Sequence, residues 1–227
     1  MILSHMQLEE IASAVTKDFN EFFFGKDTDN ERSTAQATPI DQFAKDYLGL
    51  SVSFAHLSSD GSLCGLTTYV DTEYTIEEQG VKRTIPLKAN QVLLDLSFIQ
   101  PGQVHALCGK RRFTLAHECA HQILFGMESD NDKRTHESKY APRAAYSLRD
   151  LKTREDWNEW QANVLGAAIL MPQKEIDIAM RQFARGRVLK NYEGRFNYID
   201  RLSLTLLCQS LGVSKSAAII RLRQLGY

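Results

Sequence analysis

The segment RRFTLAHECAH, residues 111–121, sets two histidines four positions apart with a glutamate directly after the first. In an α-helix, residues i and i+4 lie on one face a single turn apart, so His117 and His121 can present their imidazoles to the same point. Glu118 is rotated by about 100° from His117 and lies beside that point. This spacing is typical of helices in which two histidines bind a metal ion and the glutamate is the general base.

The alternative is a packing helix that carries two histidines by coincidence. The whole chain has six histidines, and two of them fall at the required offset with the glutamate in place. The helix is also amphipathic, with Phe113, Leu115, Ile123 and Leu124 among its apolar residues. Coincidence is therefore the less favoured interpretation.

A catalytic zinc ion needs a third protein ligand and an open fourth position. One extension of the motif places glycine at 124 and histidine at 127, but this chain has Leu124 and Met127. The segment EWQANVLGAAILMP offers Glu159 instead. Glu155, one turn earlier, is a competing ligand, although a carboxylate in the first turn of a helix is already explained by the helix dipole.

Glu159 and Asn163 share a face of that second helix, and Ala162 is small enough to let the two helices approach closely. We expect Glu159 to complete a set of two histidines and one carboxylate. The side-chain oxygen of Asn163 is expected to accept the outer N–H of a ligand imidazole and so fix its tautomer. Glu118 would take a proton from the attacking water and pass it to a leaving amine.

The rest of the chain predicts an α+β fold with helices before and after a small antiparallel sheet. A first helix ends at Gly25, and a second, capped by Thr38 with Pro39 as its first residue, runs to Leu48. Five short segments rich in β-branched or aromatic residues predict strands, and residues 72–87 predict a hairpin. The strands are expected at 51–57, 63–70, 72–78, 81–87 and 91–99.

Helices return after a charged segment that predicts a long loop. One begins at a capping box of Thr153 and Asp156 and runs to residue 170, and another covers 173–184. Two amphipathic helices then meet at Gly212, with Ser214 capping the second, in a helix-turn-helix-like pattern. We expect a peptidase-like domain over 1–172 and a helical subdomain over 173–227 packed on it.

The long segment between the two motif helices holds candidates for stabilising an oxyanion: Tyr140, Tyr146, His136 and Arg143. A tyrosine in a charged loop is more often a packing anchor, so none is preferred. A substrate peptide is expected to add as a strand to a sheet edge, either along 92–99 or along 63–70.

Charge and cysteine usage limit the other possibilities. The net charge is −1, yet residues 181–227 carry +7 and the remainder −8. Packing or substrate docking is preferred over direct DNA binding for this tail, because apolar residues such as Ile219 and Leu222 must be buried. No apolar run is long enough for a membrane span, and no leader is recognised, which predicts the cytoplasm. The four cysteines form no C-x-x-C pair and are expected to be buried.

The elements RRFTLAHECAH, EWQAN and AAILMP together resemble the signature of the ImmA/IrrE family of zinc metallo-endopeptidases. The resemblance extends to the first helix, to PIDQFA before GLSV, and to the tail VSKSAAIIRLRQLG. It implies a gluzincin-like (zincin) domain, Zn²⁺ held by His117, His121 and Glu159, and Glu118 as the catalytic residue.

The resemblance also implies a protein substrate. Relatives typically cleave a helix-turn-helix repressor, often encoded nearby on a mobile element or prophage, or act in stress-response or toxin–antitoxin circuits. The rival hypothesis is a non-catalytic regulator that binds a transcription factor or DNA on the same scaffold.

Overall fold

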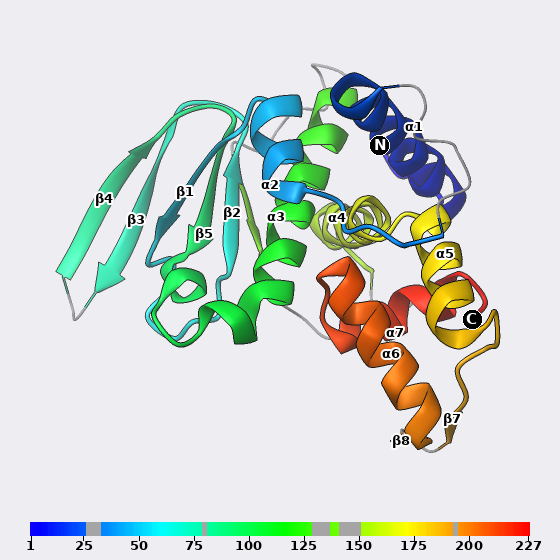
Figure 1. Cartoon of the computed structure of the whole chain (residues 1–227). Coiled ribbons are helices and arrows are strands. Elements are labelled where there is room, and N and C mark those ends of the chain that lie inside the picture. Colours follow the sequence, from blue (N-terminus) through cyan, green and yellow to red (C-terminus); the bar gives the residue numbers. More distant parts are fainter. Residues whose placement is uncertain (26–32, 79–80, 129–136, 141–150, 193–194) are drawn as a thin grey trace.

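Helix α3 (Val104–Met127) lies at the centre of the fold, between a sheet on one side and the other helices on the other side (Figure 1). The computed structural model describes residues 1–25, 33–78, 81–128, 137–140, 151–192 and 195–227. Helix α4 (Arg154–Leu170) packs along α3, and α1 (His5–Phe24) packs against α4. The α+β class predicted from the sequence is confirmed.

The main sheet has four strands in the order β1 (Ser51–Ala55), β5 (Gln91–Asp95), β2 (Gly65–Thr68) and β6 (Glu137–Tyr140). Strand β1 runs parallel to β5, and the other pairs are antiparallel, so the sheet is mixed and the purely antiparallel prediction is wrong. The long connection over residues 56–90 allows β5 to return in the direction of β1.

Strands β3 (Thr72–Glu78) and β4 (Val81–Leu87) form the predicted hairpin as a separate two-stranded sheet. Side chains alternate along β5: Val92 and Leu94 belong to the main core, whereas Leu93 packs with the hairpin. The hydroxyl of Tyr74 in β3 donates to the carbonyl of Leu57 at 2.7 Å. The hairpin therefore covers the face of the sheet that α3 leaves open.

Three predicted strands are shorter in the structure, and one strand was not predicted. The strands expected over 51–57 and 63–70 are β1 (Ser51–Ala55) and β2 (Gly65–Thr68). The strand predicted over 91–99 ends at Asp95, whose carboxylate accepts the N–H of Ser97 and starts a 3₁₀ turn, η3 (Leu96–Ile99). Strand β6 lies within the segment predicted to be an irregular loop. Its sequence, ESKY, has little strand propensity of its own, and pairing with β2 supplies the hydrogen bonds.

The first two helices follow the sequence closely, with one exception. Helix α1 ends at Gly25, as predicted, and it begins at a capping box of Ser4 and Gln7 that the sequence analysis did not identify. The second is a short α2 (Ile40–Gln42) that continues as a π-helical turn, η2 (Phe43–Tyr47). Thr38 is not its N-cap, because its hydroxyl donates to the buried carbonyl of Ile169 in α4 at 2.9 Å.

The C-terminal part consists of α5 (Gln173–Ala184), a small hairpin of β7 (Asn191–Tyr192) and β8 (Arg195–Phe196), α6 (Tyr198–Leu211) and α7 (Lys215–Gln224). Gly212 ends α6 in a left-handed conformation and Ser214 caps α7, as predicted. The main core takes side chains from both sides of residue 172, and the two-part division stays a prediction.

Among the described residues, no single helix is long and apolar enough to cross a membrane. The bent pair α6–α7 passes that test only when its two helices are taken together. Cys64, Cys119 and Cys208 are buried as expected, but Cys108 is exposed on the first half of α3, which corrects the prediction for that residue. None of the four is in a disulfide.

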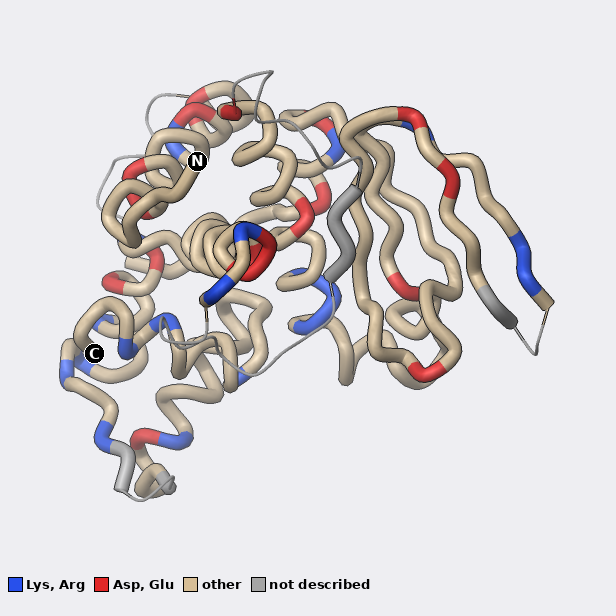
Figure 2. The backbone as a smooth tube through the Cα atoms, turned by 180° about the vertical axis from the view of Figure 1, so that it is seen from behind, with Lys and Arg blue, Asp and Glu red and all other residues tan. Residues whose placement is uncertain are grey.

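A buried ion pair joins the last helix to the first. Arg221 in α7 is fully buried, and its guanidinium donates to both carboxylate oxygens of Glu9 in α1 and to the carbonyl of Met171. Figure 2 shows that Lys and Arg positions predominate over acidic ones around the C-terminus. Because Arg221 is buried, it cannot contact DNA or a partner protein. Its positive charge, one of those that make residues 181–227 basic, therefore stabilises the packing of α7.

We expect Glu9→Gln to lower the free energy of unfolding by about 3 kcal/mol, because it leaves the buried guanidinium of Arg221 without its counter-charge. Urea denaturation at pH 7 measures this loss. The neighbouring exposed residue gives a matched control, since Glu10→Gln should change stability by less than about 0.5 kcal/mol. Equal effects of the two substitutions would contradict a stabilising role for the pair.

Candidate metal centre

Close packing of α4 on α3 places the candidate ligands. Gly166 in α4 lies against the backbone of α3, where an added Cβ would be 3.0 Å from the carbonyl oxygen of Ala116 and 3.0 Å from the nitrogen of His117. Ala162, one turn before Gly166, is fully buried in the same core. The close approach is seen at Gly166, which the sequence analysis did not single out, and the role of Ala162 in it stays a prediction.

Three side chains from these two helices converge on one point. Nε2 of His117 is 3.2 Å from one carboxylate oxygen of Glu159, and Nε2 of His121 is 3.1 Å from the other. The two Nε2 atoms are 3.0 Å apart. All of the candidate ligand atoms of these residues lie within 4.8 Å of one another.

The environment of His117 and Glu159 favours the protonation states that bind cations. Burial lowers the pKa of His117 to about 4, although Glu159 acts in the opposite direction. The pKa of Glu159 lies well below its usual range because hydrogen bonds and charge from the two histidines outweigh the effect of burial. Near neutral pH, His117 is therefore neutral and Glu159 is ionised.

This donor set fits a divalent metal ion. A tetrahedral ion with bonds of about 2.0–2.1 Å to nitrogen separates its ligands by roughly 3.3 Å, close to the separations seen here. The two imidazole Nε2 atoms face each other and the same carboxylate, so there are too few protons for each to form a hydrogen bond with every neighbour. A bound cation would interact favourably with all three groups. Two imidazoles and one carboxylate are a ligand set that zinc uses in catalytic sites.

Glu118 lies next to this cluster in an unusual state. Its side chain is fully buried, and neither carboxylate oxygen has a hydrogen-bond partner among the described residues. Its pKa is raised well above the usual value, first by burial and then by the negative charge of Glu159. Such a carboxyl is costly to keep in a folded protein unless it serves another purpose.

Comparison with models of protein families matches residues 108–223 to the IrrE N-terminal-like domain, family Peptidase_M78. The chain belongs to this family. The match covers just over half of the chain and includes α4, the C-terminal helices and all of α3 from Cys108 onward. It confirms the resemblance to the ImmA/IrrE family drawn from the sequence, and with it a metallopeptidase fold family. Comparison with curated proteins gave no match.

Of the other candidate residues in this Peptidase_M78 domain, one lies near the cluster and one does not. Asn163 lies close to His117 and acts to raise the pKa of its imidazole, against the larger lowering by burial. Glu155 is exposed in the first turn of α4 and does not join the cluster. The role of Asn163 in fixing a tautomer stays a prediction.

The candidates for stabilising an oxyanion are mostly outside the described part of the chain. His136, Arg143 and Tyr146 lie outside the described residues. Tyr140 ends β6, and its backbone pairs with Gly65 of β2. That register brings the backbone of Tyr140 next to the strand that faces α3.

The two predicted sheet edges for a substrate peptide are both wrong. Residues 92–99 include β5, which lies between β1 and β2, and residues 63–70 include β2, which lies between β5 and β6. Both strands already use their hydrogen bonds on two sides. In the described part of the chain, the outer strands of this sheet are β1 and β6.

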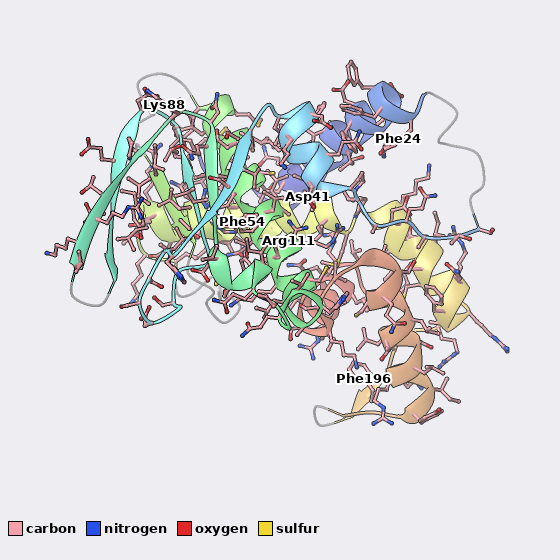
Figure 3. The ribbon with its side chains drawn as sticks, turned by 60° about the vertical axis from the view of Figure 1, so that its left-hand side comes forward. Phe24, Asp41, Phe54, Lys88, Arg111 and Phe196 are labelled. Carbon is pink, nitrogen blue, oxygen red and sulfur yellow. The ribbon has the colours of Figure 1, made fainter. Side chains whose placement is uncertain are left out.

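Several residues that hold the motif helix in place were missed by the sequence analysis. The amide of Gln122, directly after His121, donates to the hydroxyl of Thr67 at 2.7 Å and to the carbonyl of Thr68 at 2.9 Å. At the other end, Arg111 makes two hydrogen bonds to Asp41, and Figure 3 shows these two side chains facing each other. The role of Gln122 could have been suspected from the sequence, because a polar residue directly beside a candidate ligand histidine often helps to hold that histidine in place.

We expect Gly166→Ala to weaken Zn²⁺ binding by about tenfold, because the added methyl group must push α4 away from the backbone at His117 by a few tenths of an ångström. Competition with a chromophoric chelator measures the affinity. Gly126→Ala at the end of α3 is the matched control, since its Cβ would meet nothing within 4 Å. Unchanged affinity in a folded Gly166→Ala protein would contradict the argument.

We expect Glu118→Gln to stabilise the metal-free protein by an amount that grows with pH. The folded-state pKa of Glu118 is raised, so the stability associated with its protonated form is present below the unfolded pKa of about 4.5 and is lost as pH rises. Glutamine cannot ionise and avoids that loss. Melting temperatures of both proteins in the presence of a chelator, compared at pH 4.5 and 7.5, provide the measurement, and a difference that shrinks with rising pH would oppose the assignment.

Proposed function

We propose that this chain is a zinc-dependent endopeptidase that cleaves a protein substrate. The observation that carries the proposal is the convergence of His117, His121 and Glu159 beside a buried carboxylate, Glu118, whose oxygens have no hydrogen-bond partner in the described part of the chain. Membership of a metallopeptidase family supports the same reading. Zinc is the proposed ion because two imidazoles and one carboxylate match its preferred catalytic ligands.

When bound, zinc supplies a Lewis acid that lowers the pKa of water to about 7 and polarises a carbonyl group. His117, His121 and Glu159 would hold the ion, and Asn163 is proposed to orient the ring of His117. Glu118 accepts the proton of the attacking water on its carboxylate and delivers it to the leaving amine. Its surroundings raise its pKa, so once protonated it would hold the proton until the basic leaving amine takes it.

The outer strand β6 is the proposed site for the substrate backbone. It pairs with β2, the strand that faces α3, and an extended peptide beside it would gain main-chain hydrogen bonds. Tyr140, Tyr146, His136 and Arg143 remain the candidate oxyanion donors, with none preferred.

A helix-turn-helix repressor or antitoxin encoded nearby is the proposed substrate class, on the family resemblance. The burial of Arg221 and Leu222 in α7 supports a packing role for this helix over direct DNA binding. The cytoplasm is the proposed location, because all four cysteines are free and such thiols are typical of a reducing compartment.

We expect Glu118→Gln to keep zinc and to lose cleavage by a factor of at least about 10³, since it removes the only proposed proton acceptor. The test is co-expression with the product of the neighbouring reading frame, followed by mass spectrometry of fragments. Glu155→Gln, an exposed position on α4, is the matched control and should cleave normally. Full cleavage by Glu118→Gln would refute the proposal, and an intact stoichiometric complex with the wild type would favour the non-catalytic regulator.

A further inference from the structure

The face of β2 that looks toward α3 carries two different contacts in succession. Thr67 receives the amide of Gln122, as described above. Two residues earlier on the same face, Gly65 lies against Glu118, which is one helical turn before Gln122. Strand β2 therefore contacts one turn of α3 through the hydrogen bond of Thr67, and it contacts the preceding turn at Gly65, where β2 has no side chain.

The space at Gly65 is filled by the carboxylate of Glu118. A Cβ built at Gly65 would lie 2.5 Å from Oε1 and 3.2 Å from the carboxyl carbon of Glu118, well inside any van der Waals contact. It would also lie 2.6 Å from the Cγ2 methyl group of Thr114, one turn earlier on α3. Any side chain at position 65 must therefore displace one of these groups.

Backbone conformation does not explain the glycine. Gly65 is not among the glycines with positive φ, and it forms regular strand pairs with Leu94 of β5 and Tyr140 of β6. Gly65 is the first residue of β2 and no positive φ requires a glycine there, so its presence marks a close approach that needs the missing Cβ.

We propose that Gly65 is a positioning residue for Glu118. Because Gly65 has no side chain, the carboxylate of Glu118 can lie beside the metal-binding cluster, whereas a side chain at position 65 would turn it away. Glu118 has no hydrogen bond among the described residues that could fix its orientation, but its carboxylate lies against β2 at Gly65, and this close packing restricts the rotamers open to it. This inference rests on the proposed peptidase function, because it assigns Gly65 a role through Glu118.

Testing Gly65→Ala in a Thr114→Ser protein separates an effect on Glu118 from a clash with Thr114. Thr114→Ser removes the methyl group that the new Cβ would meet but keeps the hydroxyl that donates to the carbonyl of Lys110. In that background, Gly65→Ala leaves the carboxylate of Glu118 as the closest obstacle. Gly126→Ala serves again as a control for adding a methyl group to a glycine near the site.

The first measurement is kinetic, with an internally quenched fluorescent peptide library as the probe. We expect Gly65→Ala/Thr114→Ser to lower kcat by at least about tenfold relative to Thr114→Ser, with KM within about twofold. Co²⁺ affinity and the visible Co²⁺ spectrum should stay unchanged, because the three ligands are not moved. An unaltered kcat would overturn the proposal, and so would a loss of kcat that comes with an altered Co²⁺ spectrum.

The second measurement needs no activity. Gly65→Ala should lower the melting temperature of the Thr114→Ser protein by roughly 4 °C or more, and should have no such effect when Glu118→Ala is also present. Equal losses in both backgrounds would overturn the contact. Failure of the wild type to cleave any peptide would refute the proposed function alone, since this thermal comparison would still decide whether Gly65 and Glu118 are coupled.

Discussion

The approach of α4 to α3 at Gly166 is the contact on which the site depends. His117 and His121 come from one helix and Glu159 from the other, so their separations of about 3 Å exist only while the two backbones touch. Glycine in the middle of a helix costs roughly 0.5–1 kcal/mol relative to alanine. At Gly166, an added Cβ would lie 3.0 Å from the backbone of Ala116 and His117, so a residue with a side chain would push the two helices apart.

A second glycine does the same on the opposite side of α3. Gly65 gives β2 a flat surface against which Glu118 packs, while Gln122 and Arg111 fix α3 along its length. The motif helix is thus held from two sides by backbone contacts and at two points by hydrogen bonds. The result is a buried carboxylate with a raised pKa, which is unfavourable for stability and useful for proton transfer.

Local sequence patterns predicted the helices well because their signals act over a few residues. The end of the first helix at Gly25, the capping box at Thr153, the turn at Gly212 and the hairpin of β3 and β4 all appear where expected. The errors occurred where a distant group competed. Thr38 gave its hydroxyl to Ile169 in place of capping a helix, and β6 became a strand only through its pairing with β2.

The sequence alone determined which residues could bind a metal ion, because helical periodicity puts His117 and His121 on one face and Glu159 with Asn163 on another. It also determined the family, since the motifs lie together in a single domain. Only the tertiary structure decided that Glu155 stays outside the cluster, that strands β5 and β2 are inside the sheet, and that Gly65 faces Glu118. These outcomes depend on contacts between segments far apart in the chain, and a missing side chain leaves no pattern in the sequence to say what will fill its place.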